Sequence, residues 1–476
     1  MVRESCGVIG IYGKTGESVA AKIFYGLMAL QHRGQEAAGI ALTNGDDKIF
    51  LKKGYGLVSE ALPFTEISML NGRVGIGHVK YSTAGGTSLT DAQPFNLDNV
   101  ALSYNGTIVN YVEIREKLKK NGAYFTSTCD AEVLLNVLLR EYRERKDYFD
   151  ALSEMDKVVE GAYSAVCLTG KGEIIIFRDP YGFKPLCYGE IDGSFVGASE
   201  SVAIDMCGGN LISDVQPGEA LLISDGKIER KCFAKRKEKA YCMFEYVYFS
   251  RPDSIIEGIS VYDVRVRLGL NLAKTYENDA DVVVPVPDTS RPAAEGIARY
   301  SGLPVAEGLI KNRYIHRTFI MPRQSLRENA VKIKLNPLKS VLKGQRVILV
   351  DDSIVRGTTI RNIVHMIKKA GAKEVHVRIT CPPIISPCFY GIDISTHGEL
   401  IAFKHSTEEI CKIIGADSLG YQTIDGLIEA IGMGKDKLCL ACLTGEYPTP
   451  KAQEIADRMK NKCPTSKARY IEFENG

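Results

Sequence analysis

Residues 347–359 constrain the fold more than any other stretch, because they form one complete strand–loop–helix pattern. Four apolar β-forming residues, Val347–Val350, end in a pair of acidic residues. A short loop with a glycine and several hydroxyl side chains follows. Apolar residues then recur at helical spacing, at Ile360, Ile363, Val364 and Ile367, and Gly371 can end the helix. Such alternation of strand and helix favours a parallel sheet with flanking helices.

The loop side chains indicate what this unit binds. A helix N-terminus favours a phosphate, and two carboxylates at a strand end can accept bonds from vicinal hydroxyls or hold Mg²⁺. A sugar phosphate presents both kinds of group, although an ordinary capped strand–helix turn is the alternative. The segment resembles the signature of the type I phosphoribosyltransferases, which implies ribose contacts from the acids and a 5′-phosphate site in the loop. The residues concerned are Asp351, Asp352, Ser353, Arg356, Gly357, Thr358 and Thr359.

Length and composition bound the class of protein. A chain of 476 residues is too long for one core, so we expect two domains of ~100–200 residues each, or three. A charged content of 25% and a net charge of +2 favour a soluble protein without a nucleic-acid or membrane partner. No apolar run approaches the ~20 residues of a membrane span, and residues 1–5 are not a secretory signal. We therefore expect a cytoplasmic protein whose 13 cysteines form no disulfide framework.

The pattern of strands and helices changes near residue 231. Before it, short apolar strands cluster with few helices, which indicates stacked sheets. The basic, polar segment 231–239 has the composition of a linker. Beyond it, strands alternate with helices. We therefore predict one domain over residues 6–230, a second over residues 231–450, and a charged helical tail over residues 451–476.

Cys6 stands immediately before a predicted strand. If residues 1–5 were removed, its α-amine would be a base of suitable pKa beside the thiol, although a buried strand cysteine is the commoner case. Three further motifs favour the nucleophile over a buried strand cysteine: Gln31–Ile40, Gly77–Gly85 and Ser103–Ile108. Together with Cys6 they resemble the class II glutamine amidotransferases, the N-terminal-nucleophile type. The resemblance implies a four-layer αββα sandwich, with attack of Cys6 on the glutamine amide and release of ammonia.

The same resemblance implies roles for other residues of this domain. Asn105 and the N–H of Gly106 would form the oxyanion hole, and Asp130 would bind the α-ammonium of glutamine. Thr83 would help to bind the α-carboxylate. Lys80 stands where the family has an arginine that clamps this carboxylate with a bidentate fork. We therefore expect weaker glutamine binding rather than loss of activity.

A second strand, Val282–Pro287, ends in a polar turn that could hold pyrophosphate, although a simple Pro-Asp turn is the alternative. The turn resembles the pyrophosphate loop of the phosphoribosyltransferases, and its residues are Asp288, Thr289 and Ser290. By that resemblance, Ser290 would hold Mg²⁺ together with the acidic pair Asp351 and Asp352. The cation-rich segment Lys311–Pro322 resembles the loop that closes over phosphoribosyl pyrophosphate, with Lys311 as a contact.

These motifs cover nearly the whole chain and together resemble one family, the glutamine phosphoribosylpyrophosphate amidotransferases. The resemblance implies a pentosyltransferase that moves glutamine-derived ammonia to C1 of phosphoribosyl pyrophosphate, the first committed step of purine biosynthesis. It also implies feedback inhibition by purine nucleotides and a homotetramer. Two alternatives stay open. Another class II amidotransferase would not need the acidic-pair motif, and a non-catalytic nucleotide-responsive regulator would not need Cys6 or Asn105.

A C-x-x-C pair lies near the end of the chain. Alone, such a pair is zinc-binding, redox-active or incidental, and four thiolates would suit zinc or an iron–sulfur cluster equally. The family resemblance favours a [4Fe–4S] cluster on Cys242, Cys388, Cys439 and Cys442. Members with the cluster usually carry a short propeptide before the nucleophile, and residues 1–5 fit one.

Overall fold

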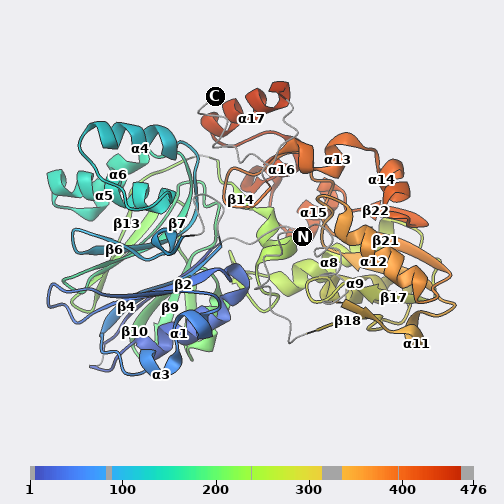
Figure 1. Ribbon diagram of the computed structural model, residues 1–476, viewed down its shortest axis with the longest axis horizontal. Coiled ribbons are helices and arrows are strands. Elements are labelled where there is room, and N and C mark those ends of the chain that lie inside the picture. Colours follow the sequence, from blue (N-terminus) through green and yellow to red (C-terminus); the bar gives the residue numbers. More distant parts are fainter. Residues whose placement is uncertain are drawn as a thin grey trace.

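The computed structural model describes residues 6–14, 16–81, 88–236, 238–312, 335–394 and 396–462 of the chain. Its elements form two lobes that lie side by side (Figure 1). The first lobe contains the sheets of the N-terminal half, and the second contains the parallel sheet of the C-terminal half. This arrangement confirms the predicted combination of a sandwich and an α/β unit.

Two antiparallel sheets make up the centre of the first lobe. The strands of one sheet are β1 (Gly7–Tyr12), β2 (Ala37–Thr43), β3 (Phe50–Tyr55), β4 (Val74–Lys80), β9 (Cys187–Ile191), β10 (Ser194–Ala198) and β11 (Asn210–Asp214). Those of the other are β5 (Phe95–Leu97), β6 (Val100–Ile108), β7 (Gly161–Thr169), β8 (Ile174–Arg178), β12 (Glu219–Ser224) and β13 (Lys227–Cys232). The strand orders are β11-β9-β10-β1-β4-β2-β3 and β13-β12-β8-β7-β6-β5.

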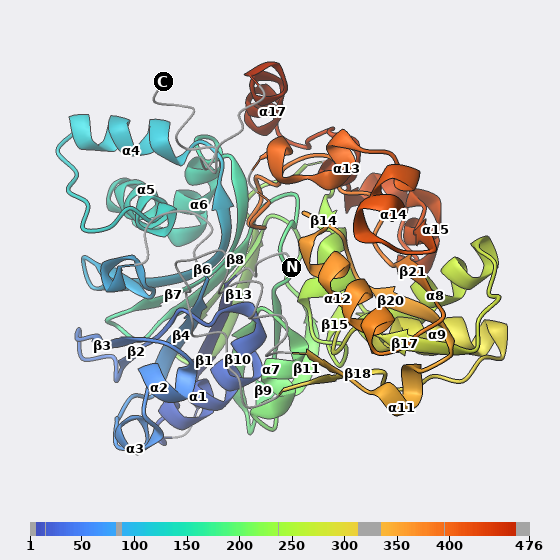
Figure 2. The ribbon, with the colours of Figure 1, turned by 45° about the vertical axis from the view of Figure 1, so that its right-hand side comes forward.

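The two sheets pack face to face and are covered by helices on their outer faces. Ile76 of one sheet and Val166 and Ile176 of the other lie in the fully buried core between them. The outer face of the first sheet packs against α1 (Ala20–Ala29), α2 (Val58–Ala61), α3 (Phe64–Ile67) and α7 (Ser201–Met206). That of the second packs against α4 (Tyr111–Lys120), α5 (Asp130–Arg145) and α6 (Tyr148–Asp156). Figure 2 shows α1–α3 and α4–α6 on opposite sides, which confirms the αββα sandwich.

Strands β1 and β4 follow the sequence pattern closely. Every residue of both strands is buried, because each strand is covered on both faces, by the second sheet and by helices. A strand buried on both faces needs a continuous apolar run rather than an alternating one. The strand predicted directly after Cys6 is β1, and β4 is one of the short strands expected before residue 231.

A four-stranded parallel sheet forms the centre of the second lobe. Its strands, in sheet order, are β17 (Val282–Pro285), β20 (Arg346–Asp351), β21 (Glu374–Ile379) and β22 (Ser418–Tyr421). On one face packs α9 (Arg291–Ser301), and on the other pack α12 (Thr358–Lys369) and α14 (Thr407–Ile414). Helices α8 (Val261–Thr275) and α15 (Ile424–Ile431) complete the lobe. The predicted strand–loop–helix unit is thus β20 followed by α12.

Shorter elements join these layers. The two-stranded pairs are β14 (Tyr241–Cys242) with β23 (Leu438–Cys439), β15 (Ile255–Ile256) with β16 (Ile259–Ser260), and β18 (Leu309–Lys311) with β19 (Leu335–Pro337). The short helices are η1 (Gln31–Arg33), η2 (Leu89–Asp91), the π-helix η3 (Glu245–Phe249), α11 (Lys339–Leu342), η4 (His397–Glu399), α13 (Ile401–Lys404), η5 (Lys435–Lys437) and α16 (Ala441–Thr444).

The predicted boundary between residues 230 and 231 falls inside β13. Lys231 and Cys232 pair with Ala220 and Glu219 of β12, so the sheet continues two residues further than the basic composition indicated. An edge strand can be polar along its whole length, because one of its faces and one of its edges meet water.

Helix α17 (Pro450–Lys462) covers the described part of the predicted helical tail, and residues 463–476 lie outside the described residues. Its inner face is apolar and buried, with Ala452, Ile455 and Ala456 in a cluster that also contains Val109 of the first lobe and Phe389 of the second. The helix therefore packs against both lobes rather than lying free on the surface.

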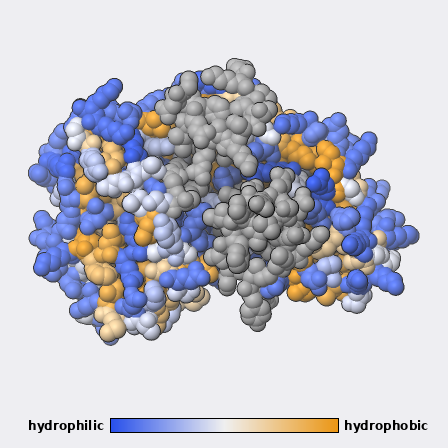
Figure 3. Space-filling view, viewed as in Figure 1, coloured by the Kyte–Doolittle hydropathy of each residue, from blue (hydrophilic) through white to orange (hydrophobic). Residues whose placement is uncertain are grey.

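No helix within the described ranges is both long and apolar enough to cross a membrane. On the described part of the face in Figure 3, hydrophobic residues lie in separate groups among hydrophilic ones.

Candidate active sites

Cys6 lies at the entrance to β1 and is half-buried. Its Sγ donates a hydrogen bond to the carbonyl oxygen of Tyr81 at 3.4 Å. Burial raises the pKa of the Cys6 thiol to about 11, while the Tyr81 hydrogen bond and the charge of Lys80 lower it. A nucleophilic role therefore requires a base close to the thiol.

Asn105 and Gly106 lie near the end of β6, in the sheet that faces β1. The Asn105 side chain is fully buried, and neither its Nδ2 nor its Oδ1 has a hydrogen-bond partner among the described residues. Buried polar groups normally have partners, so this amide is available to a ligand. Gly106 has φ +150°, and a Cβ there would lie 1.9 Å from the Ala162 carbonyl oxygen, so only glycine fits this position.

Asp130 and Lys80 provide opposite charges near Cys6. Asp130 is buried at the start of α5, where its carboxylate accepts hydrogen bonds from the Tyr104 hydroxyl and, at 3.0 Å, from the Ile108 N–H. Lys80 is buried at the end of β4. Lys80 lowers the pKa of Cys6 and Asp130 raises it, so both interact with the thiol. The fourth predicted glutamine contact, Thr83, lies outside the described residues.

The acidic pair of the second lobe lies where β20 ends. Asp351 is the last residue of the strand, and its Oδ1 accepts a hydrogen bond from the Asp352 N–H at 2.9 Å. The Ser353 hydroxyl donates to Asp352 Oδ1 at 2.7 Å. Burial raises the pKa of Asp351 well above its usual value, and the charge of Asp352 raises it further. Burial also raises the pKa of Asp352, which Ser353 and Arg265 oppose.

The loop after the acids leads directly into α12, as predicted. Gly357 has φ +76°, and Thr358 and Thr359 open the helix. The first N–H groups of the helix therefore face the loop. Arg356 is exposed and donates to Glu399 Oε2 at 2.7 Å.

The neighbouring strand β17 brings the predicted pyrophosphate loop to the same sheet edge. Pro285 of β17 lies beside Val350 of β20, and both strands end there. Ser290 is buried just before α9, and its hydroxyl has no hydrogen-bond partner among the described residues. It lies close enough to Asp351 to lower the pKa of that acid. Thus the structure places Ser290, Asp351 and Asp352 together.

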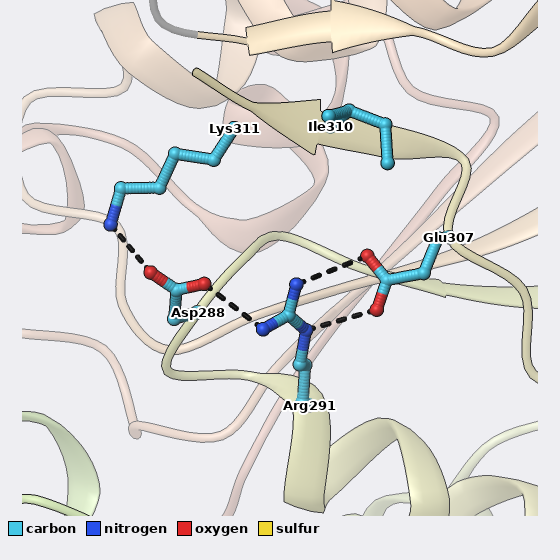
Figure 4. Close-up of a pocket in the computed structure, with 5 residues that line it drawn as sticks. All are labelled: Asp288, Arg291, Glu307, Ile310 and Lys311. Atoms are coloured by element: carbon cyan, nitrogen blue, oxygen red, sulfur yellow. Dashed lines mark hydrogen bonds and ion pairs between the residues drawn. The ribbon is translucent and has the colours of Figure 1, made fainter. Parts of the chain in front are cut away.

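A pocket lies beside this loop and is drawn in Figure 4. Its lining residues are Asp288, Arg291, Glu307, Ile310 and Lys311. Lys311 Nζ donates to Asp288 Oδ2 at 2.5 Å, and Arg291 Nη1 donates to Asp288 Oδ1 at 3.0 Å (Figure 4). Arg291 also makes two bonds to Glu307, of 3.0 and 3.2 Å. Each cation of the pocket is therefore balanced by an acid, and an anionic ligand has to displace these contacts. Residues 313–322 of the predicted closing loop lie outside the described residues.

The four cysteines predicted to hold a cluster come from three segments that meet between the lobes. Strands β14 and β23 run parallel with Cys242 opposite Cys439. The N–H groups of Ile385 and Ser386 donate to the Cys442 carbonyl oxygen at 3.0 and 3.1 Å, which ties the segment before Cys388 to the C-x-x-C turn. Burial raises the pKa of the Cys442 thiol well above its usual value, and the thiols of Cys381, Cys388, Cys439 and Cys242 raise it further.

The two donor sets differ in the metal that their chemistry suits. Two carboxylates and a hydroxyl at one sheet edge are the hard oxygen ligands that suit Mg²⁺, and a cation would oppose the raised pKa values of both acids. No three His, Cys, Asp or Glu side chains within the described residues are grouped as ligands of a single metal ion. The four thiols nevertheless fit the chemistry of an iron–sulfur cluster, which is larger than one ion and keeps its cysteine sulfurs further apart.

Several charged residues near these sites were not singled out from the sequence. Arg33, Glu200 and Glu245 are buried and joined to one another between the two lobes. Arg33 stands in the Gln31–Ile40 motif and Glu245 directly follows Phe244, so each was visible as a charge beside apolar residues. Their pairing depends on contacts across 212 positions of sequence, and no local pattern encodes it.

The two lobes and their sites define a glutamine amidotransferase domain joined to a phosphoribosyltransferase domain. Residues 81–206 match the glutamine amidotransferase domain family, and residues 266–383 match the phosphoribosyl transferase domain family. The chain is 49% identical over 463 residues to the amidophosphoribosyltransferase of Methanothermobacter thermautotrophicus, covering 96% of this chain and 97% of that protein. It is 51% identical over 452 residues to that of Pyrococcus horikoshii, covering 94% and 97%.

A solved structure gives the same result. The glutamine phosphoribosylpyrophosphate amidotransferase of Bacillus subtilis, complexed with ADP and GMP, superposes with a TM-score of 0.87 at 44% identity, covering 94% of this chain and 98% of that one. The chain belongs to the amidophosphoribosyltransferase family, the enzymes of glutamine-dependent phosphoribosyl pyrophosphate amination in purine biosynthesis.

Proposed function

We propose that Cys6 and the acidic pair are the two reaction centres of this amidophosphoribosyltransferase. Its overall reaction gives 5-phosphoribosylamine, pyrophosphate and glutamate from glutamine, water and phosphoribosyl pyrophosphate. The observation that carries the residue assignment is the pairing of two unlike sites in one chain. An amide that is buried and has no partner within the described part of the chain lies in the sheet facing the Cys6 strand, and an acid pair followed by a helix N-terminus lies in the second lobe.

In the first half-reaction, the Cys6 sulfur attacks the amide carbon of glutamine. The α-amine of Cys6, freed by removal of residues 1–5, takes the thiol proton and passes it to the departing nitrogen. The oxygen that becomes negative accepts hydrogen bonds from Asn105 Nδ2 and the Gly106 N–H. Ammonia leaves, and water then hydrolyses the thioester to glutamate. Asp130 binds the substrate α-ammonium, while Lys80 and Thr83 bind its α-carboxylate.

Replacing Asn105 by alanine should lower glutamine-dependent kcat about 10²–10³-fold, because one donor to the developing oxyanion is lost. Ammonia-dependent synthesis should be unchanged, since it does not use this site. Ser103→Ala is the matched control, because Ser103 lies on the same strand and is equally buried, and its hydroxyl has no partner in the ranges that the structure describes. Equal losses in the two variants would show a structural effect of β6 rather than a missing donor.

Replacing Lys80 by arginine should lower the KM for glutamine about fivefold. A guanidinium offers a bidentate fork to a carboxylate, and one added charge-assisted hydrogen bond is worth ~1 kcal/mol or more. The measurement is the glutamine KM at saturating phosphoribosyl pyrophosphate, with ammonia-dependent activity as the reference. An unchanged KM would contradict the proposed carboxylate contact.

In the second half-reaction, Asp351 and Asp352 bind the ribose hydroxyls. The loop formed by Ser353, Arg356, Gly357, Thr358 and Thr359 binds the 5′-phosphate through N–H and hydroxyl groups. Asp288, Thr289, Ser290 and Lys311 surround the pyrophosphate. Ser290, Asp351 and Asp352 would hold Mg²⁺, which neutralises the charge of the leaving pyrophosphate. The lobe thereby orients C1 towards ammonia and keeps water from it.

The four cysteines between the lobes would hold a [4Fe–4S] cluster with a structural role. Anaerobically purified protein should then contain iron and acid-labile sulfide in equal amounts, and Cys439→Ser should lose both and unfold at a lower temperature. Cys411→Ser should retain both, because Cys411 lies in α14, away from the three segments. Iron-free protein of unaltered stability would refute the cluster.

We propose for this chain the regulation, assembly and location that the family resemblance implies. The Bacillus subtilis relative is complexed with ADP and GMP, so purine nucleotides are the proposed feedback inhibitors. We also propose a homotetramer in the cytoplasm, with no nucleic-acid or membrane partner.

The test of the function is release of glutamate and pyrophosphate by anaerobically purified protein, with Mg²⁺ and each nitrogen source in turn. Glutamate and pyrophosphate formed in equal amounts from glutamine would support the proposal. Pyrophosphate formed with ammonia but not with glutamine would support the proposed acidic-pair site and contradict the proposed Cys6 site. No turnover from either nitrogen source, with nucleotide binding retained, would favour the regulator.

A further inference from the structure

The backbone of Tyr104, the residue before the proposed oxyanion donor Asn105, is held by two side chains from outside its own strand. Gln93 Oε1 accepts a hydrogen bond from the Tyr104 N–H at 2.7 Å, and Gln93 Nε2 donates to the Tyr104 carbonyl oxygen at 3.3 Å. His78 Nε2 bonds the same carbonyl oxygen at 3.3 Å. Gln93 and Tyr104 are each 2% exposed, and His78 is fully buried. These two side chains therefore hold the peptide group that leads into Asn105.

The Gln93 side chain continues the ladder between β5 and β6 where the backbone of β5 does not. Phe95 lies opposite Leu102 in that ladder, so position 93 falls opposite Tyr104. Strand β5 begins only at Phe95, after Pro94, and proline cannot donate to a ladder. The side-chain amide of Gln93 carries a donor and an acceptor, as a peptide group does, and takes its place. Position 93 therefore needs a long side chain with both a donor and an acceptor.

His78 makes its contact with Tyr104 as a neutral donor. Burial lowers the pKa of His78 to about 3, so the imidazole is uncharged near neutral pH. Since a carbonyl oxygen only accepts hydrogen bonds, the proton of the neutral ring lies on Nε2. The Tyr104 carbonyl oxygen thus accepts two hydrogen bonds, from Gln93 and from His78. With both of its lone pairs in use, this peptide group is fixed in one orientation.

Tyr104 also contacts the residue that is proposed to bind the α-ammonium of glutamine. Its hydroxyl donates to the carboxylate of Asp130. The loop before Asp130 is held by a neighbour of Gln93, because Asp91 Oδ1 accepts from the Thr128 N–H at 2.8 Å and from the Thr128 hydroxyl at 3.0 Å. Asp91 is itself buried. One short segment of chain therefore supports both halves of the proposed glutamine site.

We infer that Gln93 is a positioning residue for amide transfer, which sets the Asn105 side chain against the developing oxyanion by holding the peptide group of Tyr104. Tyr104 is a second positioning residue, whose hydroxyl orients Asp130 towards the α-ammonium. The inference rests on the proposed roles of Asn105 and Asp130. Its physical basis is that donors to an oxyanion act from preorganised positions, and a misplacement of about 1 Å can cost about 10²-fold in rate.

Gln93→Met tests this inference, and Gln422→Met is its matched control. Methionine is similar in length to glutamine but donates no hydrogen bond and accepts only weakly. Gln422 of the second lobe is equally buried, donates to the Leu268 carbonyl oxygen at 3.0 Å and accepts from the Thr423 N–H at 3.1 Å. The measurements are kcat and KM for glutamine, the rate of ammonia-dependent synthesis, and the unfolding temperature.

In Gln93→Met, kcat with glutamine should fall about 10–100-fold while KM stays within about twofold of wild type, because the misplaced donor acts in the transition state. Ammonia-dependent synthesis should stay within about twofold of wild type. Gln422→Met should unfold at a lower temperature and keep the wild-type ratio of glutamine-dependent to ammonia-dependent rates. A wild-type kcat in Gln93→Met, or an equal fall of that ratio in both variants, would overturn the inference.

Tyr104→Phe separates the two contacts. It removes the hydroxyl that bonds Asp130 and leaves the backbone contacts of Gln93 in place. The KM for glutamine should therefore rise about fivefold with kcat near wild type, since one hydrogen bond that orients a substrate-binding group is lost. A fall of kcat as large as that of Gln93→Met, at unchanged KM, would contradict the separate roles.

Gln93→Glu is the second variant at this position, for the case that Gln93→Met does not fold. An ionised carboxylate accepts from the Tyr104 N–H but cannot donate to the carbonyl oxygen, whereas a protonated carboxyl group does both. Because burial raises the pKa of a carboxyl group, kcat of the variant relative to wild type should rise as the pH falls from about 8 to about 6. A ratio that is independent of pH would overturn the inference.

The same assays separate the inference from the proposed function. Wild type that releases no glutamate from glutamine would contradict the proposed function, and the inference with it. An active wild type whose Asn105→Ala variant loses activity while Gln93→Met keeps it would overturn the inference alone.

Discussion

Replacing Cys6 by alanine is expected to abolish glutamine-dependent synthesis, with a loss of at least about 10³-fold, because the acyl-accepting sulfur is gone. Ammonia-dependent synthesis should persist, since the second lobe and its acidic pair are untouched. The measurement is pyrophosphate release from phosphoribosyl pyrophosphate with glutamine and with ammonia. The ratio of the two rates separates a missing nucleophile from a general loss of folding.

Cys232→Ala is the control for the first prediction. Cys232 is exposed at the end of β13, where its thiol donates to the Ala234 carbonyl oxygen, so both activities should stay near wild type. Mass measurement of the purified wild-type protein adds a further check, because the proposed base exists only if the mature chain begins at Cys6. A fully active enzyme that begins at Met1 or Val2 would contradict that base, and a Cys6→Ala variant active with glutamine would contradict the nucleophile.

Replacing Asp351 by asparagine should lower synthesis from both nitrogen sources at least about 10²-fold. The substitution removes a carboxylate that contacts the ribose and holds Mg²⁺, and such groups act in the transition state. Although the substitution lowers activity, it should leave the stability of the metal-free protein unchanged or raise it. Burial and Asp352 raise the pKa of Asp351 in the folded protein above its unfolded value of about 3.9.

The sign of that stability effect depends on pH. A carboxyl with a raised folded pKa favours the folded state fully below about pH 4, and this contribution is lost as the pH rises towards the folded pKa. At neutral pH and without a cation, Asp351 is therefore less favourable to the folded state than a neutral side chain would be. Asp351→Asn should unfold at an equal or higher temperature than wild type in the absence of Mg²⁺. Added Mg²⁺ should stabilise the wild type more than the variant.

Asp417→Asn provides the contrast. Asp417 accepts a hydrogen bond from the Val375 N–H at 2.7 Å and pairs with Lys368, and these contacts lower its pKa below the usual range. Asparagine at this position should lower the unfolding temperature and leave activity intact. If Asp351→Asn behaved like Asp417→Asn, Asp351 would be a structural residue and the proposed site would be wrong.

The sequence by itself determined the elements whose pattern is local. The apolar run after Cys6 located β1, and the run before Asp351 with the helical spacing after it located β20 and α12. Residues of both candidate sites could also be predicted from the sequence. At a strand end or a helix start, the side chains of a few consecutive residues lie close together. These features need only the periodicity of one element.

Only the tertiary structure decided what lies beside what. It placed Cys242 opposite Cys439, left the buried Asn105 amide without a partner among the described residues, and paired Arg33 with Glu245. It also extended β13 past the predicted boundary and buried the inner face of α17. Each of these depends on strand register or on charges that meet across more than a hundred residues. Register and burial follow from packing of the whole lobe, so no local run of residues encodes them.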